Sequence, residues 1–127
     1  KENMKTKLLT ICLLLFTSQV FAGWTFLSMH PDGVEYYIDS ERINNQGRYV
    51  TFWMLMNYPK KNQYGLLSEA HKYKVDCKKS RMKYLIVNDY EKKMGKGKIV
   101  GTPQLPDSWI KVPRISFVGT AMEKVCR

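Results

Sequence analysis

Apolar and polar residues alternate with a period of two along residues 72–77, which is typical of a half-buried β-strand. One side of this strand carries Tyr73, Val75 and Cys77, and the other carries Lys72, Lys74 and Asp76. Because the first set forms the apolar side, we expect Cys77 to point toward the core of the protein.

The C-terminal residues 116–127 follow a helical period instead. Their apolar residues recur at i, i+3, i+4, i+7 and i+8, namely Val118, Ala121, Met122, Val125 and Cys126. Ser116 is placed to cap the first turn of this helix. If the apolar stripe of the helix lies on the apolar face of a sheet, the two thiols face each other. The pattern therefore predicts a disulfide between Cys77 and Cys126 that joins helix to sheet.

Other segments with strand character lie at residues 24–29, 34–38, 48–58, 66–77, 81–90 and 99–100. Together with the helix they predict an α+β fold in which the helix lies on a sheet. Residues 48–58 are apolar on both faces, so a loop, a curved neighbouring strand or another protein chain must cover the second face.

Two local predictions concern the segments that follow. In residues 81–90, strict alternation places Met82, Tyr84 and Ile86 opposite Lys83, Leu85 and Val87. Residues 91–98 are polar, basic and contain glycine, and this composition predicts a mobile loop.

The N-terminal residues 1–22 have the pattern of a secretory signal peptide. Lys1 to Asn3 form a short extension upstream of the expected initiator Met4, an apolar run covers residues 8–16, and cleavage is expected after Ala22. Cys12 follows Ile11 rather than a small residue, so we expect no lipid anchor. The mature domain would then span residues 23–127, and the protein would be exported and be periplasmic, secreted or associated with the outer membrane. An oxidising compartment also favours the disulfide.

The charge of the chain adds a second functional signal. Without residues 1–22, which hold three lysines and one glutamate, the net charge is +8. Such a domain is expected to associate with anionic glycans or lipopolysaccharide, although the charge alone also serves solubility. We do not expect nucleic acid to be a partner. The candidate ligand-binding residues lie in three basic loops: Lys60, Lys61, Lys78, Lys79, Lys92, Lys93, Lys96 and Lys98. They form one patch if the strand order brings the loops together, and three separate solvated turns if it does not.

The sequence carries no recognisable catalytic motif. His30 and His71 have no partner at a metal-ligand spacing, and the two cysteines are not spaced as a redox pair. The run Gly95-Lys96-Gly97-Lys98 lacks the Ser or Thr of a phosphate-binding loop. We therefore expect no enzyme activity, no metal and no cofactor.

Several short motifs, in this order and spacing, resemble the bacterial surface-adhesin protein E family. They are Trp24, Asp32-Gly33-x-x-Tyr36-Tyr37-Ile38-Asp39, Val50-x-Phe52-Trp53-x-x-x-Asn57-Tyr58, Ser68, Tyr73-x-x-Asp76-Cys77, Gly97, Trp109, Pro113-x-x-Ser116 and Val125-Cys126. The resemblance covers essentially all of residues 23–127. It implies a curved six-stranded antiparallel sheet, with the helix held on its concave side by the disulfide. It also implies a homodimer, for which the second face of residues 48–58 is a candidate surface. Finally, it implies binding of host extracellular-matrix proteins.

The leading hypothesis is therefore a non-enzymatic exported binding domain that contacts its partners through basic loops. The alternative is a periplasmic structural or envelope-assembly protein that acts as a dimer. A small secreted hydrolase fits the charge but lacks catalytic residues.

Overall fold

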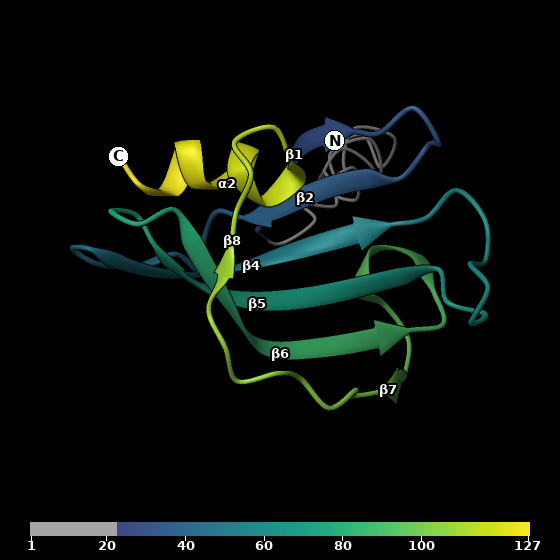
Figure 1. The fold of residues 1–127 in the computed structure, drawn as a ribbon. Helices are drawn as coiled ribbons and strands as arrows, with labels where there is room; N and C mark the ends of the chain where they lie inside the picture. Colours follow the sequence, from purple (N-terminus) through teal and green to yellow (C-terminus); the bar gives the residue numbers. More distant parts are fainter. Residues whose placement is uncertain (1–22) are drawn as a thin grey trace, which may run out of the picture.

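The computed structural model describes residues 23–127, in which one antiparallel sheet carries a single α-helix on one face (Figure 1). Its strands are β1 (Trp24–Met29), β2 (Glu35–Asp39), β3 (Asn44–Gln46), β4 (Tyr49–Asn57), β5 (Ser68–Asp76), β6 (Arg81–Tyr90), β7 (Ile99–Gly101) and β8 (Ile110–Lys111). The helix is α2 (Phe117–Val125), and a short 3₁₀ turn, η1, spans Lys93–Gly95. The expected signal peptide and Cys12 lie outside the described residues.

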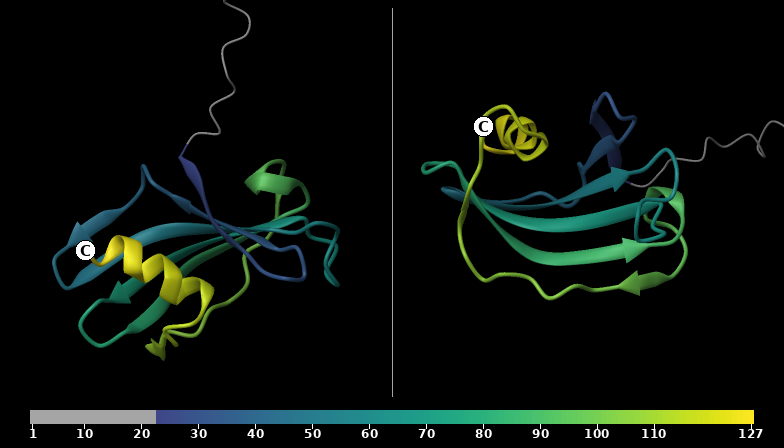
Figure 2. Two further views of the ribbon diagram at one scale, coloured as in Figure 1. Left: turned by 90° about the horizontal axis from the view of Figure 1, so that it is seen from above. Right: turned by 45° about the vertical axis from the view of Figure 1, so that its right-hand side comes forward.

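The main strand order is β1-β2-β4-β5-β6-β7, with β3 paired to β4 and β8 paired to β6. The central strands curve around the side that carries α2 (Figure 2). The α+β architecture predicted from the sequence, an antiparallel sheet with a C-terminal helix on one face, is confirmed.

The hydrophobic core lies between α2 and the inner face of the sheet, the face that carries the helix. The sheet contributes buried side chains from β2, β4, β5 and β6, including Ile38, Val50, Phe52, Met54, Tyr73, Val75 and Met82. The helix contributes Val118, Ala121, Met122 and Val125, which is the stripe that the helical spacing predicted. Each set follows the period of its own element, so a single interface buries both.

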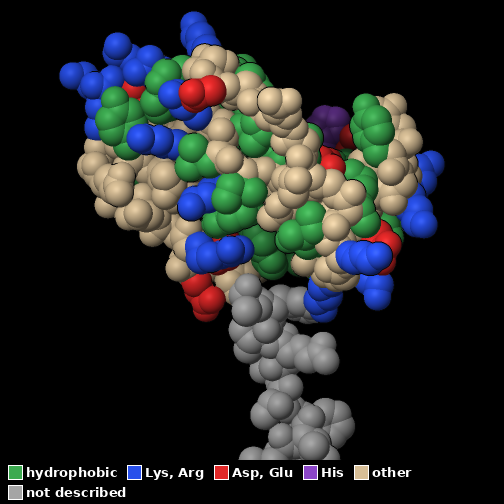
Figure 3. Space-filling view, turned by 90° about the horizontal axis from the view of Figure 1, so that it is seen from below, with side chains coloured by type: hydrophobic (Ala, Val, Ile, Leu, Met, Phe, Trp, Pro, Cys, Tyr) green, Lys and Arg blue, Asp and Glu red, His purple; other side chains and the backbone are tan. Residues whose placement is uncertain are grey.

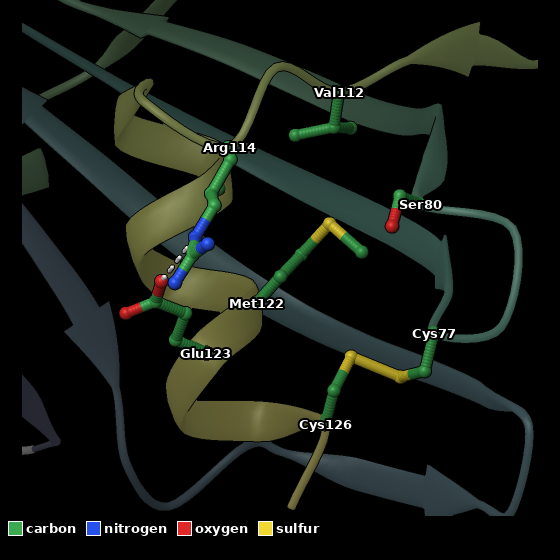
Figure 4. A pocket seen from close by; sticks show the side chains of 8 residues that line it. Cys77, Ser80, Val112, Arg114, Met122, Glu123 and Cys126 are labelled. Atoms are coloured by element: carbon green, nitrogen blue, oxygen red, sulfur yellow. Dashed lines mark ion pairs between the residues drawn. A yellow bond between two sulfur atoms is a disulfide. The ribbon is translucent and has the colours of Figure 1, made fainter.

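The predicted disulfide between Cys77 and Cys126 is present, with the two Cα atoms 5.6 Å apart. Cys77 directly follows β5 and Cys126 directly follows α2, so the bond joins the end of a central strand to the end of the helix (Figure 4). At the other end of the helix, the Ser116 hydroxyl accepts a hydrogen bond from the backbone N–H of Gly119 at 3.0 Å, as a capping residue should. The helix is thus fixed at both ends.

Gly119 lies inside α2, where glycine usually lowers helix stability. A Cβ atom at this position would lie 2.5 Å from the carbonyl oxygens of both Pro113 and Arg114. The glycine therefore allows the preceding segment to pass close against the helix. This close approach is the structural reason for a residue that the helical pattern alone does not favour.

The alternation predicted for residues 81–90 is wrong beyond Tyr84. Tyr84 pairs with Tyr73 and Ile86 pairs with Lys72, which leaves Leu85 as an extra residue in a β-bulge. As a result Ile86 lies on the outer face, away from α2, and Val87 is buried on the inner face. A one-residue insertion reverses every later side chain, and strict alternation takes no account of it.

The second apolar face of β4 is partly covered by the chain itself. Leu55 is fully buried, and η1 lies against this part of the outer face. The turn is held by hydrogen bonds from the Met94 backbone N–H to Asn57 Oδ1 (2.9 Å) and from the Gly95 backbone N–H to Ser68 Oγ (2.9 Å). Residues 93–95 are therefore anchored to the sheet, whereas the sequence predicted a mobile loop.

Candidate functional site

The basic loops named from the sequence lie at two opposite ends of the sheet. Lys60 and Lys61 follow β4, and the lysines at 92, 93, 96 and 98 follow β6; antiparallel pairing brings these two loops to the same end. Lys78 and Lys79 lie in the turn between β5 and β6, at the other end. The nine residues of β5 span roughly 30 Å between these ends. The eight lysines are all exposed, but they do not form one patch.

A third set of cations lies between these ends, on the outer face of the sheet. The register places Thr51, Lys74 and Lys83 in one row across β4, β5 and β6, and Trp53, Lys72 and Ile86 in a neighbouring row. Tyr49, Asp76 and Arg81 form a further row. Figure 3, which views the molecule from the side away from α2, shows Lys and Arg side chains interspersed with hydrophobic ones.

We call this surface the outer array. It comprises six cations and four aromatic residues: Arg42, Arg48, Lys72, Lys74, Arg81 and Lys83, with Trp24, Tyr49, Trp53 and Trp109. The sequence pattern places Lys72 and Lys74 on the polar side of the strand that ends at Cys77. What it misses is the pairing of such cations with aromatic rings from distant segments.

Aromatic rings hold most of these cations in place. The Arg42 guanidinium lies 4.8 Å from the centre of the Trp53 ring, and the Lys74 ammonium lies 5.0 Å from the centre of the Tyr49 ring. On the far side of the array, the guanidinium of Arg81 and the ammonium of Lys83 lie 4.5 and 4.9 Å from the Trp109 ring. These are cation–π distances, and such contacts fix a cation without neutralising its charge.

A buried carboxylate organises one end of the array. Asp76 is 0% exposed, and its oxygens accept hydrogen bonds from the guanidinium groups of Arg48 (2.9 and 3.0 Å) and Arg81 (3.0 Å). The backbone N–H groups of Lys78 and Lys79 donate to it as well, each at 3.1 Å. The hydrogen bonds from Arg48, with those from the Lys79 backbone and Arg81, hold the pKa of Asp76 well below its usual range. One carboxylate thus orients two guanidinium groups and leaves an excess of positive charge.

Asp76 should make the stability of the domain depend on pH. Because its pKa is lower in the folded protein than in the unfolded chain, its contribution is fully present above about pH 4 and is lost as pH falls further. We expect Asp76→Asn to lower the melting temperature by several degrees at pH 7, and the difference from the wild type to narrow at pH 2.5. Thermal unfolding followed by circular dichroism at both pH values measures this. A difference independent of pH would contradict the assigned role of the charge.

The inner face carries a polar cluster beyond the end of the hydrophobic core. His71 Nδ1 and the Tyr73 hydroxyl are hydrogen-bonded at 2.7 Å, and His71 Nε2 lies 3.7 Å from Glu69 Oε1. The nearby His71 ring lowers the pKa of Glu69, while burial and the Glu69 carboxylate raise the pKa of Asp89. Within residues 23–127, no group of three or more His, Cys, Asp or Glu side chains is arranged to hold a metal ion.

The other sequence-derived histidine, His30, lies in the exposed turn between β1 and β2. Its ring faces the carboxylate of Asp32, with His30 Nδ1 3.0 Å from Asp32 Oδ1. The two histidines thus lie in separate surroundings and form no common site.

A crevice of about 370 Å³ opens between α2 and the end of β5 (Figure 4). Its walls include the Cys77–Cys126 disulfide and Met122, and an Arg114–Glu123 ion pair of 3.8 Å lies at one side. Because both sulfur atoms are bonded to each other, this crevice offers no free thiol for nucleophilic chemistry. We also find that no helix in the described part of the chain is long and apolar enough to span a membrane.

Comparisons with known proteins agree with this architecture. A family model described as surface-adhesin protein E matches residues 24–127, and no curated protein sequence matches the chain. Crystal form II of Haemophilus influenzae protein E has a TM-score of 0.64 and 20% identity, covering 83% of this chain and 87% of that one. Protein E from non-typeable Haemophilus influenzae has a TM-score of 0.61 and 21% identity, covering 86% and 78% of the two chains.

At these identities the solved structures show the shared fold. The family match is broader evidence, because it runs from the start of β1 to the last residue and so includes the sheet, the helix and both bonded cysteines. The chain therefore belongs to the surface-adhesin protein E family.

Proposed function

We propose that residues 23–127 act as an exported, non-enzymatic binding domain that contacts anionic or protein partners through its basic loops. Candidate partners are host extracellular-matrix proteins, in keeping with an adhesin family, and anionic envelope components such as lipopolysaccharide or acidic glycans. Export would depend on the expected signal peptide of residues 1–22.

One observation carries this proposal. Lys60, Lys61, Lys78 and Lys79 are exposed at the two ends of the sheet, and none of them forms an ion pair with a carboxylate of residues 23–127. Their charge is thus available to an external anion, and attraction of this kind weakens as salt is added.

The test is a variant with Lys60, Lys61, Lys78 and Lys79 all changed to glutamate. We expect its affinity for immobilised laminin and for lipopolysaccharide to fall at least about tenfold, because the change replaces local attraction with repulsion. Surface plasmon resonance at two salt concentrations measures both ligands. Binding equal to that of the wild type would remove these loops from the proposed function.

The alternative, an envelope-assembly protein that acts as a dimer, is favoured by a separate observation. A groove of about 510 Å³ lies between the β1–β2 hairpin and the start of α2, and two exposed apolar side chains line it, Met29 (63% exposed) and Ile115 (97% exposed). Apolar side chains exposed to this degree are typical of contact surfaces when they cluster. Sedimentation at low concentration separates this alternative from the first, since it requires a dimer.

A further inference from the structure

We propose that the outer array binds an acidic polysaccharide, a chain that carries sulfate or carboxylate groups at regular intervals. This inference rests on the proposed binding function and deepens it by narrowing the candidate partners to one ligand class. It also assigns the contact to the face of the sheet rather than to the loops.

The first argument is the geometry of the charges. Lys72 and Lys74 lie on the same side of β5, two residues and therefore about 6.8 Å apart along the strand. Lys83 lies beside Lys74 on the adjacent strand, which is about 4.8 Å away. These cations thus stand on central strands of a hydrogen-bonded sheet, and their spacing is fixed by the backbone. A rigid, extended set of positive charges suits a ligand with several anions along one chain.

The second argument is the charge balance of the face. Three carboxylates form ion pairs with the six cations of the outer array, and two of them, Asp39 and Asp76, are buried against arginines. The third, Asp107, is 96% exposed and lies 3.5 Å from the Lys83 ammonium. Lys72 and Lys74 form no ion pair with a carboxylate of residues 23–127. The centre of the array therefore keeps its positive charge.

The third argument is preorganisation. Tyr49, Trp53 and Trp109 hold cations from three different segments of the chain by ring contacts. A long side chain that is already held in place loses less conformational freedom when a ligand binds. Because aromatic rings are neutral, this restraint does not consume the charge that the ligand needs.

The same ring contacts argue against single-stranded nucleic acid. Proteins that bind single strands offer open aromatic faces on which bases stack. Here each of the four aromatic residues of the array already has a cation of the protein over its ring. A planar membrane surface is also less suited, because Lys72, Lys74 and Lys83 are only partly exposed whereas the loop lysines are exposed and would meet a plane first.

The test compares two matched triple variants of the full exported protein with its disulfide intact. The array variant carries Lys72→Gln, Lys74→Gln and Lys83→Gln. The control carries Arg114→Gln, Lys124→Gln and Arg127→Gln, three exposed cations in or beside α2 that belong neither to the array nor to the basic loops. Each loses three positive charges without gaining a negative one. Melting curves establish that both fold, and isothermal titration with heparin in 0.15 M salt measures affinity. A third variant, in which the same three array lysines become arginine, keeps the charge.

We expect the array variant to lose at least about tenfold in heparin affinity, the control to lose less than about threefold, and the arginine variant to bind nearly as the wild type does. Heparin should also change the tryptophan fluorescence of the wild type, because Trp53 and Trp109 lie within the array. Equal losses in both glutamine variants would overturn the inference, as would no loss in the array variant.

Two further probes complete the test, a single-stranded DNA oligonucleotide and vesicles of phosphatidylcholine with phosphatidylglycerol. Tighter array-dependent binding to either of them than to heparin would overturn the choice of polysaccharide. The outcome can be distinguished from that of the proposed function. If heparin binds through the array while the lysine-to-glutamate changes in the loops leave the affinity for laminin unchanged, this inference is supported and the role of the loops is contradicted.

Discussion

Replacing both Cys77 and Cys126 with serine is expected to lower the free energy of unfolding by about 4 kcal/mol, on the chain-entropy model of disulfides. The bond closes a loop between residues 49 positions apart, and this constraint on the unfolded chain is lost in the variant. A loss of this size is a large share of the roughly 5–15 kcal/mol that typically separates folded from unfolded domains.

The helix should be the element most affected. A nine-residue helix is too short to be stable alone in water, since isolated helices need roughly 12–15 residues. It therefore depends on the contacts of Val118, Met122 and Val125 with the sheet and on the disulfide at its end.

Urea unfolding of the wild type with and without dithiothreitol, compared with that of Cys77→Ser/Cys126→Ser, measures the effect. The serine variant is its own control because a reductant should not change it. A reduced wild type with an unchanged midpoint would contradict the prediction.

Much of this architecture is predictable because the strand alternation and the helical spacing each mark an apolar face, and the two faces pack against each other. The alternation around Tyr73 and Val75 and the helical spacing of Val118 and Met122 each mark one buried side, and the structure brings those sides together. The segment predicted at residues 24–29 is β1 with the same limits. Local patterns suffice here because each element buries its own apolar face.

The bulge at Leu85 and the burial of Asp76 are less accessible to the same reasoning. A bulge depends on how a strand meets its neighbour, which alternation within one strand does not record. Alternation puts Asp76 on the polar side of its strand, yet it is fully buried because Arg48 and Arg81 reach it from two other segments. Both features arise from pairing across the sheet.

The outer array, a candidate binding surface, is also difficult to predict from the sequence. In the sequence, Lys72, Lys74 and Lys83 look like the ordinary solvated side of two strands. The proximity of Lys83 to Trp109 depends on where residues 102–109 run after β7, and that path is set by the pairing of β8 with β6. Runs of adjacent lysines in loops are conspicuous in sequence, whereas a cluster assembled from single residues on different strands is not.

Truncating Tyr73 to alanine should cost about 3–5 kcal/mol, the usual cost of removing a large aromatic side chain from a core. Tyr73 is 0% exposed, and its ring centre lies 5.9 Å from that of Phe52 and 5.3 Å from that of Tyr84. The resulting cavity would lie in the middle of the inner face, with rings on two neighbouring strands losing contacts.

The conservative variant Tyr73→Phe separates packing from hydrogen bonding. It keeps the ring but removes the hydroxyl, so His71 Nδ1 loses its hydrogen-bond partner. The other ring nitrogen of His71, Nε2, is buried and has no hydrogen bond in the structure. We expect a smaller loss, about 1–3 kcal/mol, the usual cost of leaving a buried polar group unpaired. Urea unfolding at pH 7 measures both variants. If phenylalanine costs as much as alanine, the hydroxyl rather than the ring would be the main contribution of Tyr73, and ring packing would not be what stabilises the middle of the inner face.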